Sequence, residues 1–285
     1  MIAARITDNR VLCTHGERRR MSRPSDLIDI GANLTHESFR PDFDAVLARA
    51  REAGVAQIVV TGASAGGSRA AQVLAQDHRG FLYATAGVHP HHAHEYDDAT
   101  DALLRELAAA PEVKAVGETG LDYFRHYSPR EAQIAAFERQ LAIAVDCGKP
   151  LFLHQRDAHA DFVTCLDRVR DRVSRAVVHC FTGERDELVD YLDRDCHIGI
   201  TGWICDERRG LHLRELVKLI PADRLMIETD APYLLPRDLQ PKPSHRRNEP
   251  MYLGHVCAAV AAARGEDVAV TAATSTANAR AFFAL

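Results

Sequence analysis

The sequence predicts one α/β domain folded as a TIM (β/α)8 barrel. Three features predict this fold: a length of 285 residues, an alternation of short apolar runs with amphipathic stretches, and polar side chains that follow the apolar runs. With 46% hydrophobic residues, a chain of this length can bury the core of one large barrel. The alternation itself is typical of βα units around a parallel sheet.

Eight short apolar runs are expected to form the strands. They cover residues 27–30, 58–60, 82–88, 113–116, 151–153, 176–178, 197–200 and 225–227. These runs are nearly all apolar and do not alternate with polar residues, as expected for strands that are covered on both faces. Eight parallel strands can close into a barrel without a free edge, although an open doubly wound sheet would show the same alternation.

The stretches between the runs carry apolar residues at helical spacing. Phe43, Val46, Leu47 and Ala50 form one such pattern, and similar patterns span residues 134–145 and 162–169. We expect these segments to be helices on the outside of the barrel.

Composition limits the environment and the partners of the chain. The formal net charge of −5 gives no global attraction to polyanions, so any contact with nucleic acid must be local. The seven cysteines are scattered and form no CxxC pair, which favours a reducing compartment, and we expect the cytoplasm. No apolar run reaches the ~20 residues of a membrane span, so we expect no membrane contact, and we expect a monomer.

The first part of the sequence differs from the rest. Residues 1–24 are rich in arginine and lack the apolar region of a signal peptide. We expect them to be a disordered extension, which leaves residues 25–285 as the barrel domain.

Polar residues that can bind metal lie within or directly after six of the runs. They are Asp29, His89, Glu118, His154, His179 and Asp230. In a TIM barrel, the carboxyl ends of all strands meet at one mouth, which carries the catalytic groups. A single histidine in such a place is more often structural, but several at corresponding positions indicate a common site.

Glu118, His154, His179 and Asp230 are the predicted metal ligands. Two imidazoles and two carboxylates bind Zn²⁺ or Mn²⁺ well, and carboxylates with water suit Mg²⁺. A metal in an open site lowers the pKa of bound water, and a nearby carboxylate can accept the proton. We therefore predict a metal-dependent hydrolase, with Asp230 as the base and Glu118 as a ligand of one metal or a bridge between two.

Seven short motifs carry a family resemblance. They are GETGLD at 117–122, HCFTG at 179–183, ETDAP at 228–232, HQRD at 154–157, VHPH at 88–91, RRNEP at 246–250 and NAR at 278–280. Together and in this order they resemble the TatD family of metal-dependent deoxyribonucleases, over roughly residues 27–285. The resemblance implies hydrolysis of phosphodiester bonds, typically from 3′ ends and with RNA also a plausible substrate. It carries over the four predicted ligands, with Asp230 as ligand and base.

One departure from the family pattern concerns the first strand. Many relatives have Asp-x-His-x-His there, whereas this chain has Asp29 and then Asn33 at the place of the second histidine. An asparagine oxygen is a poorer ligand than imidazole for zinc-like ions. We therefore expect one well-formed metal position and a conditional second one near Asp29, Asn33 and His89. The expected metal is Mg²⁺, with Mn²⁺ and Zn²⁺ as alternatives.

Basic and aromatic residues near the predicted mouth are candidates for substrate binding. Arg237, Arg246 and Arg247 lie in a proline-rich loop after the last run, and Arg208 follows the seventh. They are placed to meet the phosphates of DNA or RNA ends, although a solvated basic loop is the ordinary alternative. Aromatic candidates for stacking on the bases of a single-stranded end are Tyr123, Phe124 and Trp203.

The sequence thus predicts a 3′-5′ exonuclease on single-stranded DNA, with RNA as a further substrate. Two other classes stay open. A small-molecule amidohydrolase can share such a barrel, but many of those enzymes have a first-strand histidine pair, and a lysine-derived bridging group where this chain has Glu118. A catalytically inert barrel that serves as an interaction protein is the other alternative, which the four predicted ligands disfavour.

Overall fold

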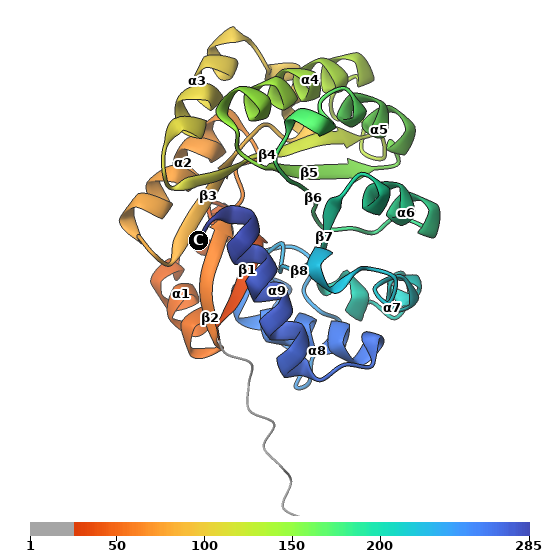
Figure 1. Ribbon diagram of the computed structural model, residues 1–285. Coiled ribbons are helices and arrows are strands. Elements are labelled where there is room, and N and C mark those ends of the chain that lie inside the picture. Colours follow the sequence, from red (N-terminus) through yellow and green to blue (C-terminus); the bar gives the residue numbers. More distant parts are fainter. Residues whose placement is uncertain (1–25) are drawn as a thin grey trace, which may run out of the picture.

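The computed structural model describes residues 26–285 as one layer of parallel strands inside a ring of helices (Figure 1). The predicted extension at residues 1–24 lies outside the described residues. The strands follow one another in chain order around a single eight-stranded parallel sheet. They are β1 (Leu27–Ala32), β2 (Val55–Val60), β3 (Leu82–Ala86), β4 (Val113–Asp122), β5 (Leu151–Arg156), β6 (Ala176–Val178), β7 (Cys196–Ile200) and β8 (Leu225–Ile227).

The sheet curves until its two ends meet. The backbone N–H of Asp230, just after β8, donates to the carbonyl of Gly31 in β1 at 2.8 Å. The N–H of Asn33 donates to the carbonyl of Ala231 at 2.6 Å. These bonds bring the first and last strands together into a nearly closed barrel. The prediction of a TIM barrel is therefore confirmed, and the open sheet is excluded.

Helices cover the outside of the barrel. The α-helices are α1 (Phe43–Glu52), α2 (Ala65–Asp77), α3 (Asp98–Ala109), α4 (Arg130–Cys147), α5 (His159–Asp167), α6 (Arg185–Asp193), α7 (Leu211–Leu216), α8 (Leu253–Arg264) and α9 (Val268–Phe283). Short 3-10 helices are η1 (Glu37–Phe39), η2 (Pro90–Glu95), η3 (Arg170–Arg172), η4 (Gly202–Cys205), η5 (Ala222–Arg224) and η6 (Pro250–Tyr252). The three helical patterns of the sequence correspond to α1, α4 and α5.

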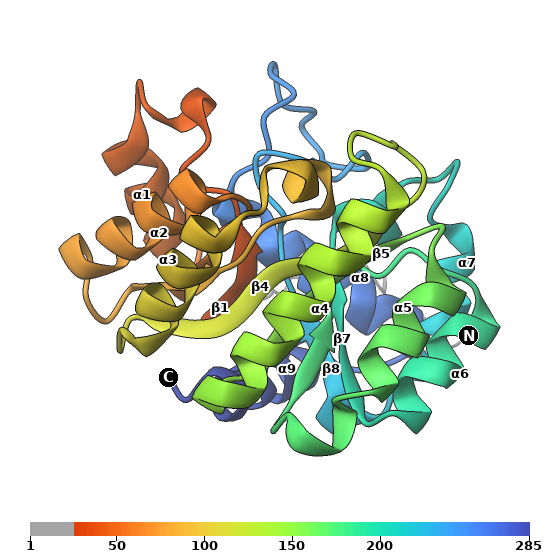
Figure 2. The same ribbon diagram turned by 90° about the horizontal axis from the view of Figure 1, so that it is seen from above.

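The last helix, α9, closes the amino-terminal end of the barrel. In Figure 1 it crosses in front of the strands, and in Figure 2 the loop after β8 rises on the opposite side. Phe282 and Phe283 of α9 are buried against apolar side chains of the barrel interior. Burial of such large aromatic side chains stabilises the barrel end strongly. The carboxyl-terminal mouth is thereby left as the end that can receive a ligand.

Two strands differ in length from their predicted runs. β4 continues six residues beyond the predicted 113–116, to Asp122, so that Glu118 lies within the strand and not after it. The predicted third run, 82–88, is a strand only to Ala86. β4 stays paired with β5 in this extension, with Gly120 opposite His154. A Cβ at Gly120, whose φ is +147°, would lie 1.9 Å from the carbonyl oxygen of His154, so the close pairing requires glycine there.

Within residues 26–285, none of the helices combines the length and the apolar character that crossing a membrane requires.

Candidate metal centre

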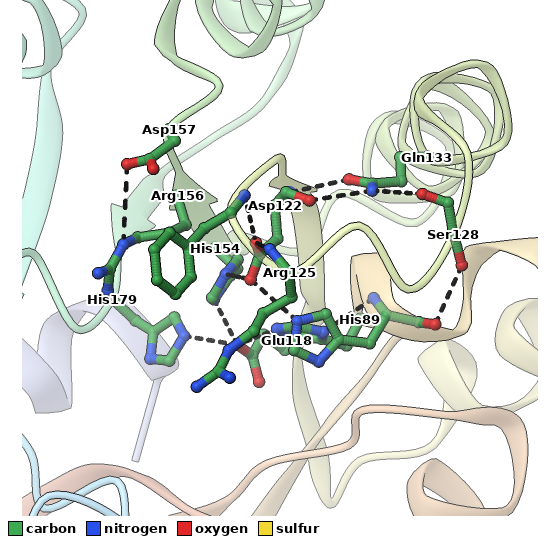
Figure 3. A network of polar contacts seen from close by, with 12 residues as sticks. His89, Glu118, Asp122, Arg125, Ser128, Gln133, His154, Arg156, Asp157 and His179 are labelled. Atoms are coloured by element: carbon green, nitrogen blue, oxygen red, sulfur yellow. Dashed lines mark hydrogen bonds and ion pairs between the residues drawn. The ribbon is translucent and has the colours of Figure 1, made fainter.

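Three histidines surround one carboxylate oxygen of Glu118 at the mouth of the barrel (Figure 3). The distances to Glu118 Oε1 are 2.7 Å from His179 Nε2, 3.0 Å from His154 Nδ1 and 3.4 Å from His89 Nε2. The four side chains come from β4, β5 and the loops after β3 and β6. Glu118, His89 and His179 are buried, and His154 is largely so. Neighbouring strands therefore deliver one carboxylate and three imidazoles to a single point.

Charge compensation determines the protonation of this cluster. Burial alone would raise the pKa of Glu118, but the charge of His179 and hydrogen bonds from His154 and His179 hold that pKa well below its usual range. Burial alone would lower the pKa of His179, and the charges of Glu118 and Glu228 raise it well above its usual value. Burial holds the pKa of His89 well below its usual value. Glu118 is thus an anion facing at least one neutral imidazole, as a metal site requires.

His154 offers a second nitrogen on the other edge of its ring. Its Nε2 lies 3.4 Å from Asp122 Oδ2, is buried, and has no hydrogen-bond partner among the described residues. Asp122 Oδ2 also lies 2.9 Å from His91 Nε2. The pKa of Asp122 lies well below its usual range, because the adjacent imidazoles of His154 and His91 outweigh the effect of burial. Asp122 therefore holds two imidazoles beside the cluster.

A second buried carboxylate, that of Glu228, contacts the ring nitrogen of His179 that does not face Glu118. Glu228 is wholly buried, its Oε2 lies 3.3 Å from His179 Nδ1, and its Oε1 accepts from the backbone N–H of Cys180 at 2.5 Å. Two glycines make the space for it. A Cβ at Gly31 would lie 2.4 Å from Glu228 Oε2, and one at Gly199 would lie 2.6 Å from Oε1. A carboxylate that accepts a hydrogen bond from one nitrogen of an imidazole fixes the orientation of the ring. The second ring nitrogen of His179, Nε2, is thereby held toward Glu118.

Asp230 belongs to the other side of the mouth. Its Oδ1 accepts a hydrogen bond from Asn33 Nδ2 at 2.9 Å. Burial raises the pKa of Asp230 to about 8, with the charges of Glu118 and Glu228 adding to the effect and His179 opposing it. A carboxylate with a pKa near neutrality is suited to exchange a proton with substrate or water.

Asp29 does not point into the cluster. Its carboxylate accepts from the backbone N–H of Thr229 at 2.9 Å and from the Thr229 hydroxyl at 2.5 Å. Burial raises its pKa to about 7. Its contacts show a residue that fixes the turn between β8 and Asp230. Its contribution to a second metal stays a prediction.

The residues present fit a divalent cation. Ligand atoms of His89, Glu118 and His154 all lie within 4.8 Å of one another, and His179 Nε2 contacts the same oxygen of Glu118. Imidazole nitrogens with one carboxylate form a donor set for Mn²⁺ or Zn²⁺, and all three imidazoles here face the same oxygen of Glu118. Of the predicted ligands, Glu118, His154 and His179 thus lie together. His89, which was predicted near a second metal position, lies in contact with Glu118 beside these ligands.

The predicted basic residues differ in their surroundings. Arg208 and Arg237 lie near the buried Asp206, at 3.6 Å and 3.8 Å from its Oδ1, and both keep exposed side chains. Arg246 is exposed and makes no hydrogen bond or ion pair within residues 26–285. Arg247 is engaged differently, because its guanidinium donates to Asp42 at 2.7 Å and to the buried Glu249 at 2.7 Å, as well as to the carbonyl of Ser38.

A hollow of about 400 Å³ lies beside the cluster, between the loops after β5, β6 and β7. Trp203 forms part of its wall. The guanidinium carbon of Arg156 lies 5.6 Å from the centre of a Trp203 ring, and that of Arg209 lies 4.2 Å from it. Phe124, which is exposed, lies 4.7 Å from the Arg156 guanidinium carbon. The predicted stacking candidate Tyr123 is instead buried and donates to Asp161. The lining residues are Gln155, Arg156, Asp157, Thr182, Gly183, Glu184, Glu187, Trp203, Arg209 and His212.

Comparison with known proteins identifies the family of this chain. The sequence model of the TatD-related DNase family matches residues 28–284. The chain belongs to this family. It is 53% identical over 259 residues to a protein of Erwinia amylovora named 3′-5′ ssDNA/RNA exonuclease TatD, covering 91% of this chain and 100% of that one. It is 51% identical over 259 residues to the protein of the same name from Escherichia coli K12, covering 91% and 99%.

A solved structure also shares the fold. The TatD homologue YJJV of Escherichia coli matches with a TM-score of 0.83 and 29% identity, over 91% of this chain and 98% of that one. Membership in the TatD family confirms the predicted resemblance and the predicted class, a metal-dependent hydrolase that acts as a nuclease.

Three polar residues of this TatD-family site were not assigned from the sequence. They are His91, Asp122 and Glu228, each of which stands in a motif that was recognised. Glu228 carried a further signal, because it is a carboxylate that directly follows an apolar run. His91 and Asp122 gave no comparable signal, since the contact between them depends on the length of β4.

Proposed function

We propose that this TatD-family chain is a 3′-5′ exonuclease that hydrolyses phosphodiester bonds at single-stranded DNA or RNA ends. The observation that carries the proposal is the convergence of His89, His154 and His179 on Glu118 at the barrel mouth. The relatives at 53% and 51% identity, which bear the name of that activity, support it.

The site residues divide the chemistry between them. Glu118 and its three histidines would hold a divalent cation, which supplies a water of lowered pKa and neutralises charge on the phosphate when bound. Asp230, oriented by Asn33, accepts the proton of the attacking water. Glu228 and Asp122 hold His179 and His154 in place.

The hollow beside the cluster is the proposed place of the terminal nucleotides. Trp203 would stack on a base, and Arg156 would meet a phosphate, whereas the guanidinium of Arg209 already donates twice to Asp206. Arg208, Arg237 and Arg246 are exposed near the same mouth and would contact the strand further from its end. We leave Arg247 out of this surface, because its ion pairs occupy its guanidinium.

The identity of the metal is part of the proposal. The imidazoles around Glu118 favour Mn²⁺ or Zn²⁺ at that position, whereas the oxygens of Asp230 and Asn33 suit the expected Mg²⁺ at a weaker second position. We also propose a monomer that acts in the cytoplasm. The six cysteines of the described residues are free thiols, as a reducing compartment allows.

An end-specific cleavage assay tests the proposed activity. Purified protein with Mg²⁺ or Mn²⁺ is given four substrates: a 5′-labelled single strand, the same strand with a blocked 3′ end, its blunt duplex, and a circular single strand. A ladder that shortens from the 3′ end of the free strand is expected, with little cleavage of the others. Cleavage of the circle, or equal cleavage of duplex and single strand, would contradict the proposal, and turnover of cyclic amides alone would favour an amidohydrolase.

A further inference from the structure

A second group of metal-binding side chains lies outside the Glu118 cluster. It consists of Cys205 at the end of η4, Asp238 in the loop after β8, and His255 in α8. The sulfur, a carboxylate oxygen and an imidazole nitrogen of these residues all lie within 4.8 Å of one another. The Glu118 cluster comes from β4, β5 and the loops after β3 and β6, so the two groups share no element.

The three side chains combine a buried donor with accessible ones. Cys205 is wholly buried, while the side chains of Asp238 and His255 are 46% and 33% exposed. His255 Nε2 lies 2.7 Å from Asp238 Oδ1. A cation could therefore enter from solvent past the exposed side chains of Asp238 and His255 and bind the buried sulfur of Cys205.

The donor set selects a particular class of cation. A thiolate with an imidazole and a carboxylate is a set that Zn²⁺ accepts in tetrahedral geometry, whereas Mg²⁺ requires oxygen ligands. We infer that Cys205, Asp238 and His255 bind one zinc-class divalent cation, with water at the fourth position, at a site separate from the Glu118 cluster. Burial and the adjacent Asp238 raise the pKa of the Cys205 thiol to about 12, so binding releases a proton and tightens as the pH rises.

The position of this site gives it a structural role at the mouth. Asp206 follows Cys205, and Arg237 precedes Asp238; Arg237 Nε lies 3.8 Å from Asp206 Oδ1. A cation held by Cys205, Asp238 and His255 would tie the loops after β7 and β8 to α8. It would thereby fix Arg237 at the mouth and stabilise the fold against heat.

Cobalt is the probe for this site, because a Co²⁺ ion bound to thiolate shows a charge-transfer absorption in the near ultraviolet. Metal-stripped full-length protein is titrated with Co²⁺. We expect this absorption in the wild type and in Glu118→Gln, and its loss in Cys205→Ser. Cys165→Ser removes another buried thiol, and Cys180→Ser removes the thiol next to His179; both should keep the absorption.

His255→Gln gives a second measurement that leaves the buried thiol in place. It should weaken Co²⁺ binding at this site by at least about 10-fold. Added Zn²⁺ should raise the Tm of Glu118→Gln, and should not raise that of the double variant Glu118→Gln/His255→Gln. A wild type without the thiolate absorption, or an absorption lost in Cys180→Ser and kept in Cys205→Ser, would overturn the inference. Loss of all cobalt binding in Glu118→Gln would also overturn it.

Discussion

The carboxylate of Glu228 lies 3.3 Å from Nδ1 of His179, and both side chains are buried. His179 Nε2 lies in turn 2.7 Å from Glu118. This chain of contacts runs from β8 to β4 across the barrel. The orientation of His179, a proposed metal ligand, therefore depends on Glu228, which would not itself bind the metal.

Glu228→Gln should therefore reduce activity while the fold is kept. The amide preserves the volume of the side chain and removes the charge that orients His179. We expect kcat and metal affinity to fall by about 10- to 100-fold. The matched control is Glu215→Gln, an exposed carboxylate on α7, which should change neither. Wild-type metal affinity in Glu228→Gln would show that His179 needs no such support.

Trp203→Ala tests the hollow beside the cluster. If a base stacks on this side chain, its loss should raise KM for single-stranded oligonucleotides by roughly 5- to 150-fold, which corresponds to about 1–3 kcal/mol. Tyr83→Ala is the control, because Tyr83 also lies under a cation, Lys114, but near the opposite end of the barrel. An equal effect on KM in both variants, or none in Trp203→Ala, would remove the hollow from the substrate path.

Arg247→Gln separates a structural role from phosphate binding. Glu249 is buried and is paired with both Arg247 and Arg49, so the loss of one partner leaves its charge less compensated. We expect Tm to fall by roughly 5 °C and KM to stay within about twofold. Arg40→Gln, at an exposed arginine of the same region, should change neither. A raised KM with an unchanged Tm would instead support the phosphate contact that the sequence predicted.

His197 should make the fold sensitive to acid. Burial, with the charge of Arg224 adding to it, lowers its pKa to about 4, and its Nδ1 has no hydrogen-bond partner in the described part of the chain. The unfolded chain, with a histidine pKa of about 6.5, binds the proton first as the pH falls. The free energy of unfolding should therefore decrease from about pH 6.5 down to about pH 4.

The measurement is Tm against pH for wild type and His197→Gln. The variant should lose part of the decrease over that interval, whereas His245→Gln, at an exposed position, should follow the wild type. Identical curves for His197→Gln and the wild type would contradict a neutral, half-buried His197.

Much of the barrel and its mouth could be predicted from the sequence. The apolar runs specify strands, and residues at their carboxyl ends share the mouth, which is why Glu118, His154 and His179 were predicted together. The extension of β4 to Asp122 could not be predicted, because its glycines and polar residues do not resemble a buried strand. The pairing of Asp122 with His91 and His154 was missed for the same reason.

The ion-pair and hydrogen-bond partners of individual charged side chains were the feature least predictable from the sequence. Arg247 and Asp42 are 205 residues apart, and nothing in the local sequence shows that they meet. The orientation of Asp29 toward Thr229 is a similar case, since it depends on closure of β1 against the segment after β8. Strand order is a regular property of the fold, whereas such contacts depend on individual side-chain packing.

Metal-dependent cleavage by wild type and Glu118→Gln tests the central claim most directly. Metal-stripped protein is given a single-stranded oligonucleotide and titrated with Mn²⁺ or Mg²⁺. We expect no cleavage without metal, saturable recovery in the wild type, and a rate at least about 1,000-fold lower in Glu118→Gln with an unchanged Tm. Cleavage by the metal-stripped protein, or a wild-type rate in Glu118→Gln, would contradict the assignment of the Glu118 cluster as the metal centre of a nuclease.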